Sequence, residues 1–244
     1  MLEKHNFFLE SIKNEDFDSI NNLLIEASRR AKREDLIYFD YLIENAKGSL
    51  LEKVKLNLIY LIGEIGENNI LESKYLEYLI KSYFDSDRWI RNEIIQSLGK
   101  IVDKNEVSSE IYTILAYAVL EDYIPTKMNA LKLLRRLKHV PNIIIKNIIK
   151  VIDVNNLEIV EYSIRVLKNH IKDEIALFNI LNTNRNYTLL TKNSFRTLLI
   201  EYFDFITSLE TFKEKILKAD WIDEYQNLFV KEIESFQRIL LNRK

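Results

Sequence analysis

The sequence predicts an all-α fold: a right-handed α-solenoid of antiparallel helix pairs that forms a single elongated, curved domain. Two observations support this class. The 244 residues include only four Gly and two Pro, so the chain has few of the turn-forming residues that strand-rich folds require. A helical motif also recurs: its fullest copy spans 89–101, and the place of Ile90 in that copy is taken by Val54 36 residues earlier, by Thr126 36 residues later and by Val160 34 residues after that. Such an interval indicates stacked repeats.

The chain divides into a cap, four repeats and an irregular end. Residues 1–35 are predicted to form an N-terminal cap with helices over 5–14 and 16–33. Residues 36–173 hold the clear repeats, whose helices are expected over 36–46 and 51–65, 73–84 and 88–102, 109–120 and 125–137, and 141–152 and 157–171. Residues 174–244 supply irregular pairs over 174–181 and 188–206, and over 209–218 and 221–241, with aromatic packing residues at Phe195, Tyr202, Phe203 and Phe205.

A few residues are expected to set helix ends and close contacts. Gly48 can take the left-handed conformation that ends a helix, and Asp87 can cap the helix that follows it. Gly63 and Gly99 lie inside predicted helices, where Gly costs roughly 1 kcal/mol relative to Ala. We therefore expect each of these two glycines to let a neighbouring helix approach closely.

The copy around residue 90 resembles the second helix of a HEAT repeat. The resemblance is carried by Asp87, Ile90, Arg91, Ile94, Leu98, Gly99 and Ile101. In that family the aspartate and the basic residue pair along the stack, so the resemblance implies a structural ladder through Asp87 and Arg91. Other copies depart from the pattern, because Glu161 replaces the basic residue, and Arg135 and Asn169 replace the glycine. The likeness covers 36–173 and implies a fold, since HEAT arrays host unrelated functions.

No signature of catalysis or of a cofactor is present in the sequence. The absence of cysteine excludes disulfides and thiolate metal sites. The glycines stand at 48, 63, 66 and 99, a spacing that permits neither a phosphate loop nor a dinucleotide fingerprint. His5, His139 and His170 are not followed by Glu, unlike the metal-binding His-Glu pairs of the HEAT-repeat deoxyhypusine hydroxylases. We therefore expect no cofactor, no metal and no enzymatic activity.

The sequence also lacks membrane and secretion signals. Its first residues have no basic and apolar signal pattern, and the longest apolar run, 111–120, is too short to span a bilayer. We expect a soluble, cytoplasmic protein without a membrane partner.

Charge is unevenly distributed along the chain. Residues 123–172 carry ten Lys and Arg against three Asp and Glu, a net charge of +7, although the whole chain has −2. Lys132 and Arg136 belong to a second helix of a repeat, and Lys146 and Lys150 belong to a first helix. The basic segment is therefore predicted to be split between two surfaces, which disfavours the wrapping of a polyanion.

The HEAT resemblance implies that second helices line a concave surface. When Ile90 is counted as the first position of the motif, the third, seventh and eleventh positions share one helix face, because they are four residues apart. The predicted partner-binding residues are Leu56, Tyr60, Gln96, Lys100, Met128, Lys132, Arg136, Tyr162 and His170. This mixture of apolar, aromatic and basic residues is typical of protein interfaces, whereas a phosphate-binding groove is more uniformly basic. The alternative is that Tyr60 and Val166 are partly buried between repeats.

The leading hypothesis is a non-enzymatic scaffold or adaptor that binds a protein or peptide on its concave surface. The alternative is a nucleic-acid-binding protein similar to the alkylpurine DNA glycosylases, which are built from HEAT-like repeats. Their Trp- and Asp-lined surface has counterparts in Trp89 with Asp87 and in Trp221 with Asp223. No catalytic motif aligns with these residues, and we interpret Trp89 as a packing residue.

Overall fold

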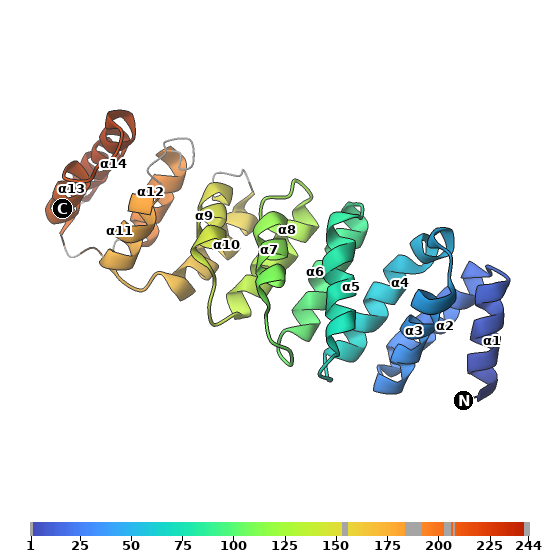
Figure 1. Ribbon diagram of the computed structural model, residues 1–244. Coiled ribbons are helices and arrows are strands. Elements are labelled where there is room, and N and C mark those ends of the chain that lie inside the picture. Colours follow the sequence, from blue (N-terminus) through green and yellow to red (C-terminus); the bar gives the residue numbers. More distant parts are fainter. Residues whose placement is uncertain (1, 153–155, 184–191, 203–205, 207, 242–244) are drawn as a thin grey trace. The chain divides into compact units, whose positions relative to one another are not determined.

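The computed structural model describes residues 2–152, 156–183, 192–202, 206 and 208–241 (Figure 1). These residues form fourteen α-helices and one short 3-10 helix, which confirms the all-α prediction. The helices are α1 (Leu2–Lys13), α2 (Phe17–Arg30), η1 (Arg33–Leu36), α3 (Ile37–Asn45), α4 (Gly48–Gly66), α5 (Ser73–Phe84), α6 (Arg88–Ile101), α7 (Ser109–Ala118), α8 (Ile124–Arg136), α9 (Asn142–Val151), α10 (Leu157–His170), α11 (Glu174–Thr183), α12 (Lys192–Glu201), α13 (Leu209–Leu217) and α14 (Asp223–Leu241). The chain forms two compact units, Met1–Ile114 and Leu115–Lys244.

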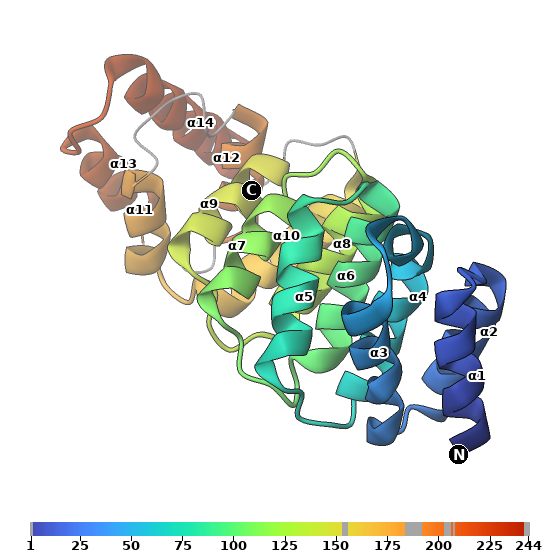
Figure 2. The same ribbon diagram turned by 45° about the vertical axis from the view of Figure 1, so that its right-hand side comes forward.

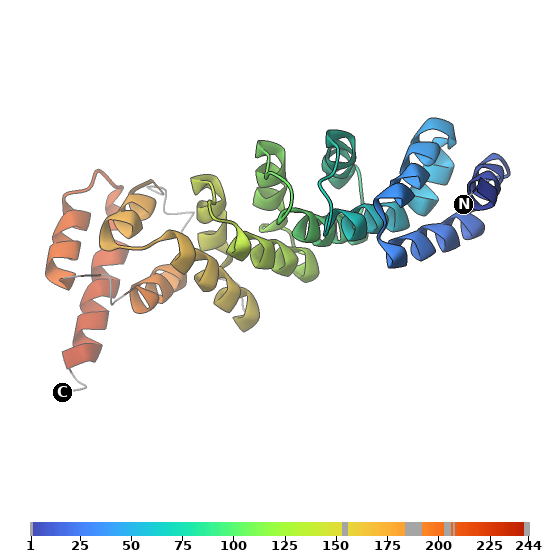
Figure 3. The same ribbon diagram turned by 90° about the horizontal axis from the view of Figure 1, so that it is seen from below.

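The first unit contains two rows of helices. Helices α1, α3 and α5 lie on one side and α2, α4 and α6 on the other (Figure 3). Helix α4 packs against α2 and against α6, so the second row is continuous. Side chains between the rows form the core, and Leu24, Leu58 and Leu98, from α2, α4 and α6, are fully buried. This sequential pairing is the helical-repeat architecture that the sequence predicts.

Polar contacts between neighbouring repeats join equivalent positions. The Asn57 side chain donates a hydrogen bond to Asn21 Oδ1 at 2.8 Å, and the two residues are 36 positions apart. The Asn105 side chain donates to the carbonyl oxygen of Asn69 at 3.3 Å, again across 36 positions. These contacts confirm the repeat interval, and they place successive helices of the row in register.

Asp87 begins α6 as a capping residue. Its Oδ1 accepts hydrogen bonds from the backbone N–H groups of Trp89 and Ile90 at 2.9 and 3.0 Å, which confirms the predicted cap. Arg91 donates to the carbonyl oxygen of Ser86 at 2.6 Å. The cap made by Asp87 and the hydrogen bond from Arg91 to Ser86 both lie within one repeat.

The close approach predicted at Gly63 is confirmed. A β-carbon at Gly63 would lie 2.5 Å from Ser97 Oγ and 2.9 Å from Ser97 Cα. The buried Ser97 hydroxyl donates to the carbonyl oxygen of Ile59 at 3.1 Å, which holds α6 against α4. The same prediction for Gly99 is wrong, since a β-carbon there would meet nothing within 4 Å. Positions two residues apart on a helix differ by about 200° around its axis, so Gly99 faces away from the contact that Ser97 makes.

The prediction for Gly48 is also wrong. Helix α3 ends at Asn45, where Ala46 takes an extended conformation with φ −85° and ψ 141°. Gly48 is the first residue of α4 and has no positive φ. A left-handed residue does end a helix elsewhere, because Ala31 has φ 49° after α2. The extended Ala46 redirects the chain, so this turn does not need a left-handed glycine.

The second unit is also built from neighbouring helices. Helix α10 packs against α8 and α9, and α14 packs against α12 and α13 (Figure 2). Trp221 is 6% exposed, and its Nε1 donates to Asn182 Oδ1 at 2.8 Å. Phe195 lies 3.7 Å from Phe229, between ring centroids, which confirms its predicted packing role. Tyr202 is buried as predicted, whereas Phe203 and Phe205 lie outside the described residues.

Candidate partner-binding faces

The predicted partner-binding residues lie on two surfaces, one in each unit. Leu56 and Tyr60 belong to α4, and Gln96 and Lys100 belong to α6. The α4–α6 face comprises these four residues together with Glu64, Trp89 and Glu93. The other predicted residues form the α8–α10 face, which comprises Met128, Lys132, Arg136, Tyr162, Arg165 and His170.

A charge cluster occupies the middle of the α4–α6 face. Lys100 donates a hydrogen bond to the Glu64 carboxylate, and its Nζ lies 4.8 Å from the centroid of the Tyr60 ring. The hydrogen bond between Tyr60 and Glu64 raises the pKa of the Tyr60 hydroxyl, and burial raises it further. Lys100 and Glu64 hold the same motif position in neighbouring repeats, and Tyr60 adds the position four residues earlier, so the structure brings two of the predicted positions together.

Glu93 joins this cluster and was missed by the sequence analysis. Burial raises the pKa of the Glu93 carboxyl, with an opposing effect from Lys100 and a further increase from Glu64. Lys100 is therefore a counter-charge for two carboxylates, those of Glu64 and Glu93. Glu93 stands one repeat after Asn57, and the packing of α6 beside α4 brings its carboxylate near Glu64.

Two large apolar side chains of the α4–α6 face are open to solvent. Leu56 is 45% exposed and Trp89 is 58% exposed, and Gln96 is exposed as predicted. The interpretation of Trp89 as a packing residue is wrong. Its place at the second residue of α6, beside the capping Asp87, puts the indole at the helix end and outside the core.

The α8–α10 face has cations around one aromatic ring. Lys132 Nζ and Arg165 Cζ lie 5.6 and 5.5 Å from the centroid of the Tyr162 ring. Both distances suit cation–π attraction. Arg165 also forms an ion pair with Glu161 in the preceding turn of α10. Arg136, the last residue of α8, is exposed.

Two predicted members of this face are less accessible than expected. Met128 is 6% exposed, so its prediction as a partner-binding residue is wrong. The alignment of repeats assigned Met128 to the surface position, but the apolar side chain is turned into the interior. His170 is half-buried, and burial lowers its pKa, as do His139 and Lys172. Val166 is fully buried, in agreement with the alternative interpretation of that position.

The basic segment is only partly available at the surface. Lys127 is 7% exposed, and burial lowers its pKa. Lys168 pairs with Glu201 at 2.6 Å. Lys146 and Lys150 belong to α9, whereas Lys132 and Arg136 belong to α8. The ten basic side chains therefore do not all line one groove.

Among the described residues, no group of three or more His, Asp or Glu side chains is placed to hold a metal ion. Within the same part of the chain, no helix combines the length and apolar character needed to cross a membrane.

No protein-family model matches the chain, and no curated protein matches it. Among solved structures, the chain is similar to one described as "Crystal Structure of Engineered Protein. Northeast Structural Genomics Consortium Target OR329". The two share 13% sequence identity with a TM-score of 0.43, and the alignment covers 90% of each chain.

Proposed function

We propose that this chain is a HEAT-like interaction scaffold without catalytic activity that binds a protein or peptide on its α4–α6 face. The observation that carries the proposal is the pairing of two exposed apolar side chains, Leu56 and Trp89, with a half-buried charge cluster. Aromatic anchors beside partly desolvated charges are typical of protein interfaces. The lack of cysteine fits a cytoplasmic location.

The cluster also favours one kind of partner chemistry. Lys100 already donates to Glu64, so the Glu93 carboxylate shares this counter-charge with Glu64 in a partly desolvated position. A desolvated carboxylate gains most from a cation that approaches it directly. A partner segment that carries Lys or Arg next to an apolar residue would supply that cation and would cover Leu56 and Trp89.

Site-specific photo-crosslinking in the protein's own host cells tests this proposal. A photoreactive residue at Gln96 is expected to capture a discrete partner, whereas the same residue at Lys13, an exposed position of α1, is not. The double variant Leu56→Ala/Trp89→Ala should lose the Gln96 product, since both substituted side chains are exposed and the fold is retained. Equal products at both positions, or an unchanged product in the double variant, would count against the α4–α6 face.

A second candidate function is nucleic-acid binding by the α8–α10 face. It is supported by Lys132 and Arg165, whose charged ends lie near the Tyr162 ring, since aromatic rings with nearby cations can stack bases and contact phosphates. Fluorescence anisotropy with labelled duplex DNA and RNA tests it. Binding should weaken steeply as salt rises, and it should weaken in Lys132→Ala. No binding at low salt would remove this candidate.

A further inference from the structure

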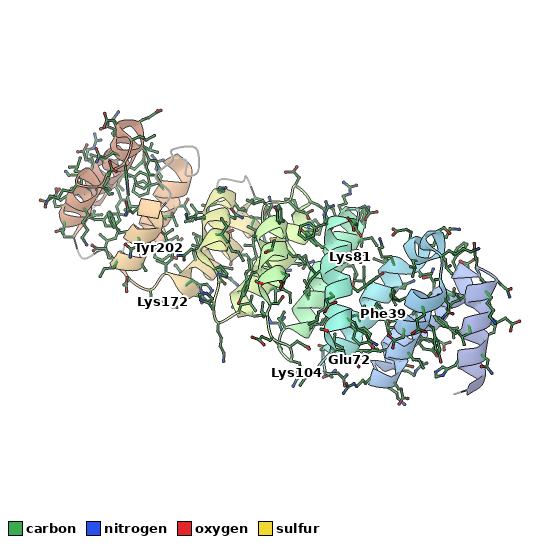
Figure 4. All side chains as sticks on the ribbon, in the orientation of Figure 1. Phe39, Glu72, Lys81, Lys104, Lys172 and Tyr202 are labelled. Atoms are coloured by element: carbon green, nitrogen blue, oxygen red, sulfur yellow. The ribbon has the colours of Figure 1, made fainter. Side chains whose placement is uncertain are left out.

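A groove lies between α3 and α5 in the first unit, in the helix row opposite the α4–α6 face. It encloses about 390 Å³ and is lined by Phe39, Asp40, Ile43, Glu44, Lys74, Glu77, Tyr78 and Lys81. Phe39 of α3 and Lys81 of α5 mark it in Figure 4. Its volume falls within the range of ligand-binding clefts. Because it belongs to the other row, an occupant of this groove is independent of the function proposed above.

The floor of the groove is largely aromatic and apolar. Phe39 is buried and meets Tyr75 and Tyr78 edge to face, with ring centroids 5.0 and 5.1 Å apart. Burial raises the pKa of Tyr78 to about 12, so this residue stays neutral at physiological pH. Ile43 is 44% exposed and offers an open apolar contact. A partner's apolar side chain would remove this surface from water, which is favourable.

The walls of the groove carry an ordered set of charges. At one level Lys74 Nζ pairs with Asp40 Oδ1 at 2.7 Å, so these two charges neutralise each other. One turn further along, Glu44 of α3 and Glu77 of α5 are both exposed and form no ion pair within the described residues. Lys81 follows Glu77 by four residues, which is about 6 Å along a helix. The groove therefore presents two carboxylates followed by one ammonium.

We propose that the α3–α5 groove binds an amphipathic helix of a partner protein. An apolar residue of that helix packs against Ile43 and Tyr78, and a Lys or Arg lies between Glu44 and Glu77. An acidic residue four positions away faces Lys81. Charge complementarity selects this occupant, since a helix places residues four apart on one face at the same 6 Å spacing that separates the wall charges. Docking of an amphipathic helix into an apolar groove is a common recognition mode.

Binding of a designed peptide to the whole chain tests the proposal. The probe is a stapled 15-residue Ala-based helix with Arg and Glu four residues apart and Leu between them, and the control peptide carries Gln in place of Arg. Binding is followed by the isoleucine methyl NMR signals, with Ile43 assigned by Ile43→Val. The Arg peptide should shift the Ile43 signal saturably and bind about tenfold more tightly than the Gln peptide, which corresponds to one charge-assisted contact.

The double variant Glu44→Gln/Glu77→Gln completes the experiment. Both glutamates are exposed, so the variant should fold normally, and circular dichroism checks this. This variant should bind the Arg and Gln peptides equally. The proposal is overturned if wild type fails to distinguish the two peptides, if the Ile43 signal does not move at millimolar peptide, or if the double variant still prefers Arg. Loss of peptide binding in Leu56→Ala/Trp89→Ala would instead assign the peptide to the α4–α6 face.

Discussion

Lys100 donates a hydrogen bond to Glu64, the residue that holds the same place one repeat earlier, while its Nζ lies 4.8 Å from the centroid of the Tyr60 ring. One lysine of α6 thus contacts two side chains of α4. The side chains of Lys100 and Glu64 are 29% and 20% exposed, so water screens their attraction only in part. This pair is a polar link between α4 and α6 at the centre of the α4–α6 face, in addition to the buried hydrogen bond from Ser97 to Ile59.

A double-mutant cycle on Lys100→Met and Glu64→Gln should give a coupling free energy of about 0.5–1 kcal/mol, at the upper end for partly exposed ion pairs. Urea unfolding of the four proteins measures it. The coupling should fall as salt is raised, because screening weakens a pair with one open side. A coupling near zero in low salt would show that the contact does not stabilise the repeat interface.

Substitution of two helical glycines by alanine should have opposite effects. Gly63→Ala places a β-carbon 2.9 Å from Ser97 Cα and should destabilise the protein by about 1–3 kcal/mol through overpacking. Gly99→Ala meets nothing within 4 Å and should stabilise it by roughly 0.5–1 kcal/mol through helix propensity. Thermal unfolding of the two variants provides the comparison. A stabilised Gly63→Ala would contradict the close contact with Ser97.

Glu93→Gln should raise the free energy of unfolding at neutral pH. Burial raises the pKa of the folded-state carboxyl above its ordinary value of 4.5, so the folded state favours the protonated form. The stability that this preference contributes is present below pH 4.5 and is lost as pH rises through the folded-state pKa. The advantage of the variant should therefore shrink as the pH falls through the folded-state pKa and should be absent below 4.5 in urea titrations. Glu67→Gln, at an exposed position after α4, is the control and should show no such trend.

The same variant links stability to binding. If Glu93 serves a partner's cation, Glu93→Gln should weaken the Gln96 crosslink described above while it stabilises the free protein. A gain in stability together with unchanged crosslinking would separate Glu93 from the proposed interface. Residues that bind a partner are often retained although they lower the stability of the free protein. A gain in stability together with a weaker crosslink would therefore identify Glu93 as such a residue.

The two tryptophans should differ sharply in their contribution to folding. Trp221→Ala removes a 6% exposed ring that contacts Phe178 and Phe229, and it should cost about 3–5 kcal/mol. Trp89→Ala removes a 58% exposed ring and should change the free energy of unfolding by less than about 0.5 kcal/mol. Chemical denaturation followed by circular dichroism measures both. A large loss from Trp89→Ala would assign this residue to the core after all.

The repeat interval could be predicted from sequence because equivalent residues occupy equivalent places. Asn21 and Asn57, and Asn69 and Asn105, are 36 positions apart and are hydrogen-bonded. Periodicity does not determine how far each helix is rotated about its own axis, and that rotation decides which motif positions are exposed. Leu56 and Met128 align in sequence, yet Leu56 is 45% exposed and Met128 only 6%.

The α4–α6 charge cluster could be predicted only in part. Tyr60 and Lys100 stand at the seventh and eleventh motif positions, which are predicted to share one helix face, but Glu93 stands at the fourth position, which is not among them. Its recruitment depends on the side-by-side packing of α4 and α6, a tertiary relationship. The α3–α5 groove was not anticipated for the same reason, because it lies between first helices whose sequences carry no repeated motif.

The contacts of α4 also determine how the first unit would respond to force. Its row passes from α2 through α4 to α6, with Asn57 linked to Asn21 across one interface and Lys100 linked to Glu64 across the other. Under tension along this row, both interfaces carry the same force, so the extensions of the two interfaces add. A partner bound to both α4 and α6 would make the interface between these two helices stiffer. The extension of the first unit under a given force would therefore show whether the partner is bound.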